Sequence, residues 1–438
     1  MMSGEIVSLV TMALLIGLLL TGIPLAFATG MTAVILTLWL FEPDALFFIP
    51  SRIFTLMNNY ALVSVPLFVM MGCILERAGV VERMFHALHI WSGRIRGGLA
   101  VGTLLASTIL AAMVGVIGAE IVVLGLICLP TMLKRGYNKS MAVGVICAGG
   151  SLGTMLPPSI VLIVYGLVAQ VSIGELFMAA VLPGFLLVGL YLAYVLVRCY
   201  LNPSLGPVAT DEELDMPLRE KLGLMRVLIL PVALILTVLG SLYSGVATPT
   251  ETAAVGVFGA LVIAAVNKRL TWEMVYDSLK RTGSTVAMLT WIFFGASALV
   301  AVYTLAGGTS FLQELITGLP ISPLATVALM MLILIILGFF IDWIGIVLLT
   351  MPIFVPVIKS LGLDPVWFGI LFTMNMQISY LTPPFAAAAF YLKAVAPPEV
   401  TLGDIFKGVV PFIGLQVIAL LLVMFFPQIS MWLPASMR

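Results

Sequence analysis

Two proline pairs inside apolar stretches are the positions where this sequence departs most clearly from regular helix. The first lies in AGGSLGTMLPPS (148–159) and the second in NMQISYLTPPF (375–385). Proline lacks a backbone N–H and clashes with the preceding turn, so neither stretch is predicted to be one continuous helix. Unwinding in an apolar environment exposes carbonyl oxygens, which suit a hard cation such as sodium, and helix N-termini, which suit an anion.

The polar residues around these breaks are the candidate ligands. Sodium binding is predicted for Ser107, Gly150, Ser151, Thr154, Gln377, Ser379 and Thr382. Substrate binding is predicted for Thr154, Pro157, Asn375 and Pro383. Two structural alternatives stand beside these assignments: a membrane-helix hydroxyl often bonds the i−4 carbonyl of its own helix, and a proline pair also occurs as a simple kink. The presence of two such breaks favours the functional interpretation.

Three carboxylates lie within apolar runs, where a charge is costly and is a functional hypothesis by default. Glu120 and Asp342 are predicted at the tips of two hairpins, where they would bind a cation, carry a proton or hold the tip by hydrogen bonds. Glu251 instead has the spacing of a capping box with Thr248, which favours a structural role. The predicted tips comprise Gly115, Gly118 and Glu120 in the first hairpin and Asp342 and Gly345 in the second.

The composition places these residues in a membrane. Of 438 residues, 62% are hydrophobic and 9% are charged, and the formal net charge is zero, which gives no indication of nucleic-acid binding. A membrane-crossing helix needs about 20 apolar residues. Candidate spans are 5–21, 24–41, 60–76, 98–133, 138–167, 176–200, 225–243, 249–266, 283–305, 322–360, 365–394 and 408–433.

Basic residues predict which connections face the cytoplasm, because cytoplasmic loops are enriched in lysine and arginine. Four connections carry them: Arg77, Arg83, Arg94 and Arg96; Lys134, Arg135 and Lys139; Arg219, Lys221 and Arg226; and Lys268, Arg269, Lys280 and Arg281. Both flanks of 98–133 are therefore predicted to be cytoplasmic, although a helix of this length would extend about 54 Å. A re-entrant hairpin that turns near Gly115 and Gly118 resolves this conflict.

The two halves of the chain repeat each other. Pro130 and Pro356, Gly136 and Gly362, Pro157 and Pro383, and Tyr165 and Tyr391 are each 226 residues apart. Each half is predicted to hold five crossing spans and one hairpin, so the second half is inverted, both termini lie outside and the 201–224 linker lies inside. The fold class is thus an all-α polytopic membrane protein with two inverted repeats and broken helices, an architecture typical of secondary transporters.

Other chemistries have little support in the sequence. Cys73, Cys128, Cys147 and Cys199 are single residues in apolar surroundings, which predicts no redox or metal role. The pair His86 and His89 lies in an amphipathic stretch that is interpreted as an interfacial helix, and 271–281 is interpreted as its counterpart. No nucleotide-binding loop or catalytic triad is present. The prediction is a transporter and not an enzyme.

Three stretches resemble the large membrane subunit of tripartite ATP-independent periplasmic (TRAP) transporters. They are LPTMLKRGYNKSMAVGVICAGGSLGTMLPPSIVLIVYG (129–166), GVATPTETAAVGV (245–257) and NMQISYLTPPFAAAAFYLK (375–393), and the resemblance extends over essentially the whole chain. The first hairpin tip, MVGVIGAE, departs from the hydroxyl-rich tip of many family members. A tip serine ligand is therefore not carried over to this chain.

The resemblance implies a bacterial inner-membrane importer of organic acids that uses sodium as its coupling ion and has no cofactor. It also implies two protein partners, a small membrane subunit of four helices and a periplasmic substrate-binding protein. An elevator mechanism is expected, in which 98–200 and 322–438 form the moving transport domain. The scaffold would comprise 1–97 and 225–321, with interfacial helices as arms, and 201–224 as the cytoplasmic linker.

Three alternatives remain open from the sequence: a stand-alone ion-coupled or proton-coupled anion carrier without a binding protein, a channel, and a membrane enzyme. The organic acid is not specified by the residues. Because no arginine stands within the apolar part of a predicted span, the anion is expected to be held by backbone and polar groups.

Overall fold

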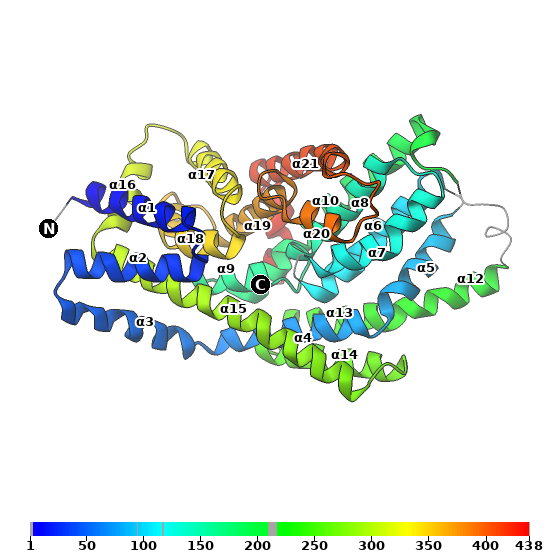
Figure 1. Cartoon of the computed structure of the whole chain (residues 1–438), viewed down its shortest axis with the longest axis horizontal. Coiled ribbons are helices and arrows are strands. Elements are labelled where there is room, and N and C mark those ends of the chain that lie inside the picture. Colours follow the sequence, from blue (N-terminus) through cyan, green and yellow to red (C-terminus); the bar gives the residue numbers. More distant parts are fainter. Residues whose placement is uncertain (1–2, 94, 116–117, 209–216, 438) are drawn as a thin grey trace.

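The computed structural model describes residues 3–93, 95–115, 118–208 and 217–437, with only the backbone at Leu218 and Arg219. Several predicted features therefore lie outside what is described: Arg94 from the basic connections, Val116 and Ile117 from the first hairpin tip, and linker residues 209–216. For Arg219, also from the basic connections, only the side chain lies outside. The described residues form helices and connecting turns without a strand, which confirms the all-α prediction (Figure 1).

The helices follow one another along the chain with short connections. They are α1 (Gly4–Leu20), α2 (Leu25–Leu40), α3 (Phe48–Met57), α4 (Ser64–Arg77), α5 (Val80–Ser92), α6 (Gly98–Val114), α7 (Ala119–Lys134), α8 (Lys139–Ser151), α9 (Ile160–Ala169), α10 (Ile173–Leu201), α12 (Leu218–Met225), α13 (Ile229–Tyr243), α14 (Pro249–Val266), α15 (Trp272–Leu305), α16 (Gly308–Thr317), α17 (Pro323–Gly338), α18 (Trp343–Ser360), α19 (Pro365–Leu381), α20 (Ala387–Val395), α21 (Leu402–Phe425) and α22 (Gln428–Ser436). Short 3₁₀ turns cover Pro43–Phe47, Tyr60–Val63, Leu152–Thr154, Pro203–Leu205 and Arg226–Leu228.

Both predicted hairpins are present. Segment 98–133 forms the helix pair α6 and α7, and segment 322–360 forms the pair α17 and α18. The first hairpin turns where Gly115 ends α6 with a φ of +67°, a left-handed conformation that glycine adopts without steric cost. The second hairpin turns at Asp342, whose side chain caps α18 by accepting a hydrogen bond from the Ile344 N–H.

Both helices with proline pairs are broken where the sequence predicted. α8 ends at Ser151 and α9 begins at Ile160, so the first break contains Pro157 and Pro158. α19 ends at Leu381 and α20 begins at Ala387, with Pro383 and Pro384 between them. The Pro157–Pro158 and Pro383–Pro384 peptide bonds are both cis.

The helix pattern follows the 226-residue repeat. The pairs α6 and α17, α7 and α18, α8 and α19, and α9 and α20 each recur at nearly this spacing, as do α2 and α14. Gly136 and Gly362 both adopt a positive φ, +77° and +71°, after the second helix of their hairpins. The contacts repeat as well, since α7 packs against α20 of the other half and α18 packs against α9. The inverted-repeat fold class is therefore confirmed.

The prediction for the interfacial helices was wrong in two respects. Residues 271–281 are not a separate helix, because α15 continues from Trp272 into the predicted span 283–305 without interruption. Nor are they the counterpart of the stretch with His86 and His89. The repeat spacing pairs α5 with α16 and pairs the first turns of α15 with α3. Hydropathy alone did not show which of these short amphipathic segments correspond to each other in the two halves.

Seven described helical stretches are long and apolar enough to cross a membrane, and five shorter apolar helices of 10–17 residues accompany them. In this shorter group, α6 and α17 are hairpin arms and α9 is half of a broken helix. The other two, α1 and α2, are spans at the short end of the range. The predicted span 408–433 was misplaced. α21 begins at Leu402, where Thr401 and Asp404 form a capping box, and it ends at Phe425 before the separate helix α22.

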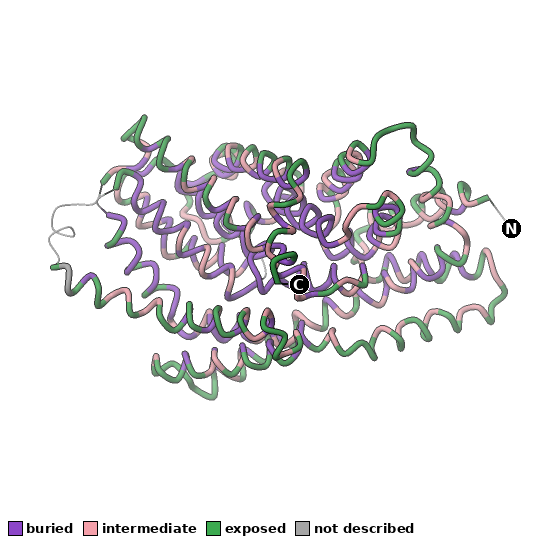
Figure 2. The backbone as a smooth tube through the Cα atoms, turned by 180° about the vertical axis from the view of Figure 1, so that it is seen from behind, coloured by how far each residue is buried: buried purple, intermediate pink, exposed green. Residues whose placement is uncertain are grey.

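Burial divides the helices into two groups. The hairpins and broken helices carry most of the buried positions, whereas α3, α13 and α14 are largely exposed along one side of the molecule (Figure 2). α15 packs against α2, α3 and α4, and α14 packs against α4 and α13. These helices lie beneath the hairpins in the view of Figure 1. Two packed groups thus face each other, with both hairpins in one of them.

Glycine permits a close helix contact within the hairpin group. Gly408 of α21 lies against Gly144 of α8, and an added Cβ at Gly408 would overlap the Ser140 carbonyl oxygen. Small residues of this kind allow membrane helices to approach with their backbones in contact. Gly414, two turns further along α21, has nothing within 4 Å of an added Cβ.

We therefore expect Gly408→Val to separate α8 from α21 and to lower the free energy of unfolding by about 1–3 kcal/mol. The matched control Gly414→Val should be nearly neutral. Thermal unfolding midpoints of the purified variants in detergent provide the comparison. Equal midpoints for the two variants would contradict the packing described here.

Candidate functional site

The first break is held closed by the first hairpin. The Ile160 N–H, at the end of the break where α9 begins, donates a hydrogen bond to the Gly115 carbonyl oxygen, 3.3 Å away in the hairpin turn. An added Cβ at Gly115 would overlap the Pro158 carbonyl oxygen, so the hairpin turn rests directly on the proline pair. Pro157 and Pro158 are buried. The predicted tip glycine Gly115 and the predicted substrate residue Pro157 are thus brought to one place.

The helices around the first break touch through small residues. Ser107 of α6 is fully buried and packs directly on Gly149 of α8, and its Oγ donates a 2.8 Å hydrogen bond to the Thr103 carbonyl. Gly150 packs directly on Ile121 of α7 in the same way. The Ser107 hydroxyl thus makes the i−4 bond that was the structural alternative.

Ser151 belongs to a buried polar cluster that the sequence analysis missed. Its Oγ donates a 2.8 Å hydrogen bond to the Ala148 carbonyl and accepts a 3.3 Å bond from Gln416 Nε2 of α21. The buried Tyr191 hydroxyl of α10 lies near the same two side chains, but it makes no hydrogen bond to the described residues. Gln416 is a lone amide in an apolar helix, which was the available signal. Thr154 Oγ1 bonds the Ser151 carbonyl at 3.0 Å and stays within the break.

Glu120 is the most unusual residue of the first break. It is the second residue of α7, is 2% exposed, and has no hydrogen-bond partner on either carboxylate oxygen among the described residues. Its Oε1 occupies the space beside Gly153, where an added Cβ would overlap it. Glu76, also a carboxylate, is close enough to interact with it electrostatically. Because an isolated buried charge is expensive, the carboxyl group must be protonated or paired with a cation.

The second break is more open. Pro383 and Pro384 are exposed and Thr382 is half-buried, with its Oγ1 donating a 2.7 Å bond to the Ile378 carbonyl. The preceding turns of α19 are buried and contain Asn375, Gln377 and Ser379. Ser379 packs directly on Gly338 of α17. Ser379 thus lies against the first helix of the second hairpin.

Two amides of the second break have unused polar atoms. Asn375 Nδ2 donates a 2.8 Å bond to the Met331 carbonyl, while its Oδ1 has no partner in the described structure. Gln377 is fully buried and neither its Oε1 nor its Nε2 has a described partner. Buried amides normally find partners. Gln377 stands 226 residues after Ser151, so the two breaks present polar groups at equivalent positions.

The second hairpin tip touches the other group of helices. Gly345, in the first turn of α18, packs directly on Leu25, the first residue of α2. Asp342 caps α18, which gives its carboxylate one structural role. Glu251, in contrast, forms the predicted capping box, with the Thr248 N–H and hydroxyl donating to its Oε2 at 2.8 and 2.9 Å. The structural interpretation of Glu251 is confirmed.

A cavity of about 260 Å³ lies at the tip of the first hairpin, between the two groups of helices. The first turns of α7, at Gly118, Ala119, Val122 and Val123, line one side. Tyr391 of α20 closes it with a ring that packs on Gly118. Glu76 of α4 and Arg281 of α15 line the other side, joined by a 2.8 Å ion pair. The continuous α15 brings Arg281 to this cavity.

A larger cavity of about 470 Å³ lies between the turn after α9 and the connection of α13 with α14. Gln170, Ser172 and Asn59 are among its lining residues, and no charged side chain lines it. The smaller cavity therefore has the chemistry for an ionic solute. The described residues contain no group of three or more histidine, cysteine, aspartate or glutamate side chains that could hold a metal, and the four cysteines are free and buried.

We expect Gly153→Ala to destabilise the chain because its Cβ would displace the Glu120 carboxylate, at a cost of about 1–3 kcal/mol. Glu120→Ala should relieve most of this cost in the double variant, which a double-mutant cycle of thermal unfolding midpoints will show. Gly189→Ala, at a helical glycine with open space around it, is the control. Additive effects of Gly153→Ala and Glu120→Ala would contradict the contact.

Known proteins resemble this chain over nearly its full length. The family "Tripartite ATP-independent periplasmic transporter, DctM component" matches residues 12–429. A C4-dicarboxylate TRAP transporter large permease protein DctM of Pseudomonas aeruginosa is 32% identical over 91% of this chain and 92% of its own length. An ectoine/5-hydroxyectoine TRAP transporter large permease protein of Ruegeria pomeroyi is 33% identical, covering 85% and 86%.

Two further likenesses extend the comparison. An isethionate TRAP transporter permease protein DctMQ of Oleidesulfovibrio alaskensis is 29% identical over 94% of this chain, which spans 64% of that longer protein. The YdaH transporter of Alcanivorax borkumensis shares the fold, with a TM-score of 0.64, 17% identity and 90% coverage of each chain. The family is one of transporter permeases rather than enzymes. The chain belongs to the DctM component family of tripartite ATP-independent periplasmic transporters.

Proposed function

We propose that this chain is the membrane permease of a TRAP-type secondary transporter that imports a small organic acid across the bacterial inner membrane, coupled to sodium. The observation that supports sodium coupling is the position of Glu120. It is a buried carboxylate beside an unwound helix, and it has no hydrogen-bond partner among the described residues. The relatives named for C4-dicarboxylate, isethionate and ectoine transport support an organic acid as the solute.

Glu120 explains how a cation would control movement of the solute. A carboxylate oxygen and the backbone carbonyls of the first break form an all-oxygen environment of the kind that hard cations prefer. Without a cation, an ionised Glu120 would make displacement of the hairpin through the bilayer costly. With sodium bound, the site is neutral and the hairpin is tied to the first break. The polar atoms of Asn375 and Gln377 offer a second cation site in the other repeat.

An elevator mechanism accounts for the two packed groups. The transport domain would comprise the hairpins and broken helices (98–200 and 322–438), and the scaffold would comprise 1–97 and 225–321. If the basic connections are cytoplasmic, Glu76, Arg281 and Leu25 all stand near the cytoplasmic ends of their helices. Both hairpin tips lie beside these scaffold residues. The first tip shares the cavity with Glu76 and Arg281, and the second tip contacts Leu25 through Gly345. The structure then corresponds to the inward-facing state.

Membership of the family supports two partners, a small membrane subunit of four helices and a periplasmic binding protein that delivers the acid. The exposed side formed by α3, α13 and α14 offers the small subunit an apolar surface, because Phe54, Leu236 and Phe258 are all more than 60% exposed there. The second candidate function is a stand-alone carrier without a binding protein. The structural similarity to the YdaH transporter is the observation that supports this second candidate.

Uptake into proteoliposomes tests the proposal. The chain and its small subunit would be reconstituted and supplied with radiolabelled succinate or isethionate, with and without an inward sodium gradient and with and without the binding protein. We expect uptake only when sodium and the binding protein are both present. Glu120→Gln should lower this uptake about tenfold or more and make the remainder insensitive to sodium, because an amide cannot supply the negative charge.

Glu273→Gln is the matched control, since Glu273 is an exposed carboxylate at the start of α15. Uptake that needs no binding protein would favour the stand-alone carrier. Uptake that ignores sodium and collapses with the proton gradient would overturn sodium coupling, and Glu120 would then be a proton carrier. Full sodium dependence in Glu120→Gln would remove this residue from the coupling mechanism.

A further inference from the structure

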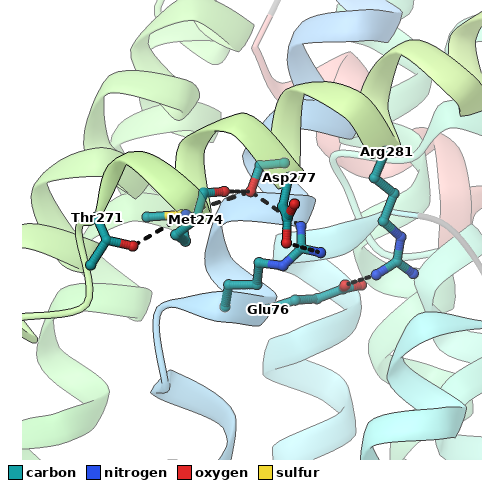
Figure 3. Close-up of polar contacts among 7 residues, drawn as sticks. Glu76, Thr271, Met274, Asp277 and Arg281 are labelled. Carbon is teal, nitrogen blue, oxygen red and sulfur yellow. Dashed lines mark hydrogen bonds and ion pairs between the residues drawn. The ribbon is translucent and has the colours of Figure 1, made fainter.

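The pair Arg281 and Glu76 lies on the scaffold side of the 260 Å³ cavity, directly across from the first hairpin tip. Figure 3 shows the two side chains meeting between α15 and α4. Asp277, on the previous turn of α15, pairs with Arg77. The Arg77–Asp277 distance is 3.6 Å, so the scaffold already has one ion pair at this level. The second pair borders the cavity, and the first does not.

Arg281 has hydrogen-bonding capacity to spare. Its Nη1 donates to Glu76 Oε2 at 2.8 Å, and its guanidinium makes no other hydrogen bond to the described residues, whereas a guanidinium carries five N–H donors. Its side chain is 48% exposed, while that of Glu76 is 10% exposed. The guanidinium therefore keeps a face toward the cavity while the carboxylate is largely covered. Guanidinium groups bind carboxylates and other planar anions through two parallel bonds.

The opposite wall also favours an anion. α7 begins at Ala119 with no side-chain cap, so the N–H groups of its first turn have no partners within the helix. Gly118 and Ala119 line the cavity, which places the positive end of the α7 dipole there. Tyr391 adds a half-exposed phenol at the edge. Positive groups thus stand on both sides of a space that lies between scaffold and hairpin.

We propose that this cavity is an anion-binding site in which Arg281 holds the carboxylate or sulfonate group of the solute after the hairpin has moved inward. The proposal rests on the proposed transport of an organic acid. Glu76 competes with the solute for Arg281, so it keeps the affinity low enough for release. The site exists only while the first hairpin tip lies opposite α4 and α15, because each side supplies part of it.

Protection of an introduced cysteine measures binding without requiring transport. Val123→Cys places a thiol in the cavity wall, and the rate of its labelling by a neutral, water-soluble maleimide is followed at constant ionic strength. The four native cysteines are buried, so the unmodified chain gives the background. Succinate and isethionate are the probes. We expect both to slow labelling, and we expect the uncharged analogue succinamide not to do so.

The variants separate anion binding from a structural ion pair. The half-protecting concentration is the succinate concentration that halves the labelling rate. Arg281→Gln should raise this concentration about tenfold or more. Glu76→Gln should lower it, because the competing carboxylate is removed. Lys280→Gln, the exposed neighbour of Arg281 outside the cavity lining, should leave it unchanged. If the pair were only structural, Glu76→Gln and Arg281→Gln would instead shift it in the same direction.

Equal half-protecting concentrations in Arg281→Gln and Lys280→Gln would overturn the proposal. So would an absence of protection by both anions in a preparation that transports either one. Protection by succinate or isethionate in a preparation that transports neither would leave the anion site standing while the proposed transport function failed. Each result is read from labelling rates, and the folding of each variant is checked by its thermal unfolding midpoint.

Discussion

A polar group in a hydrocarbon environment must find a partner or remain uncharged, and the architecture of this chain follows from that constraint. The proline pairs remove backbone hydrogen bonds from two helices, so the unwound segments cannot face lipid. In the first half, the turn of α6 and α7 lies on the break and bonds across it. In the second half, α17 and α18 cover the corresponding part of α19. The first hairpin thus covers its break, whereas α17 contacts the buried turns of α19 that precede the second break.

The two halves differ in how completely this cover is closed. The first break is buried together with Glu120, while Pro383 and Pro384 of the second break are exposed. Tyr165 and Tyr391 show the same difference at equivalent positions. Tyr165 is buried and its hydroxyl donates to the Pro365 carbonyl at 2.6 Å, whereas Tyr391 is 44% exposed beside the cavity. An inverted repeat with unequal closure is expected of one state of a transporter that alternates between two.

Much of this fold could be predicted from sequence because its signals are local. Paired prolines, the Gly115 turn and the Thr248–Glu251 spacing each specify a structure within a few residues, and all were confirmed. The continuity of α15, the pairing of α5 with α16, and the cluster of Ser151 with Gln416 depend on contacts between distant segments, which periodicity does not encode. Arg281 was missed because it belongs to a basic run that indicated a cytoplasmic loop. The sodium and substrate roles of the break residues remain predictions.

We propose that the hairpins move past the scaffold as one body. A cysteine pair, Leu25→Cys with Gly345→Cys, would cross-link the second hairpin tip to the start of α2, where the two residues touch. We expect oxidation to abolish solute uptake into proteoliposomes, a reducing agent to restore it, and Leu25→Cys alone to be unaffected. Undiminished uptake by the fully cross-linked protein would contradict movement of the hairpins relative to the scaffold.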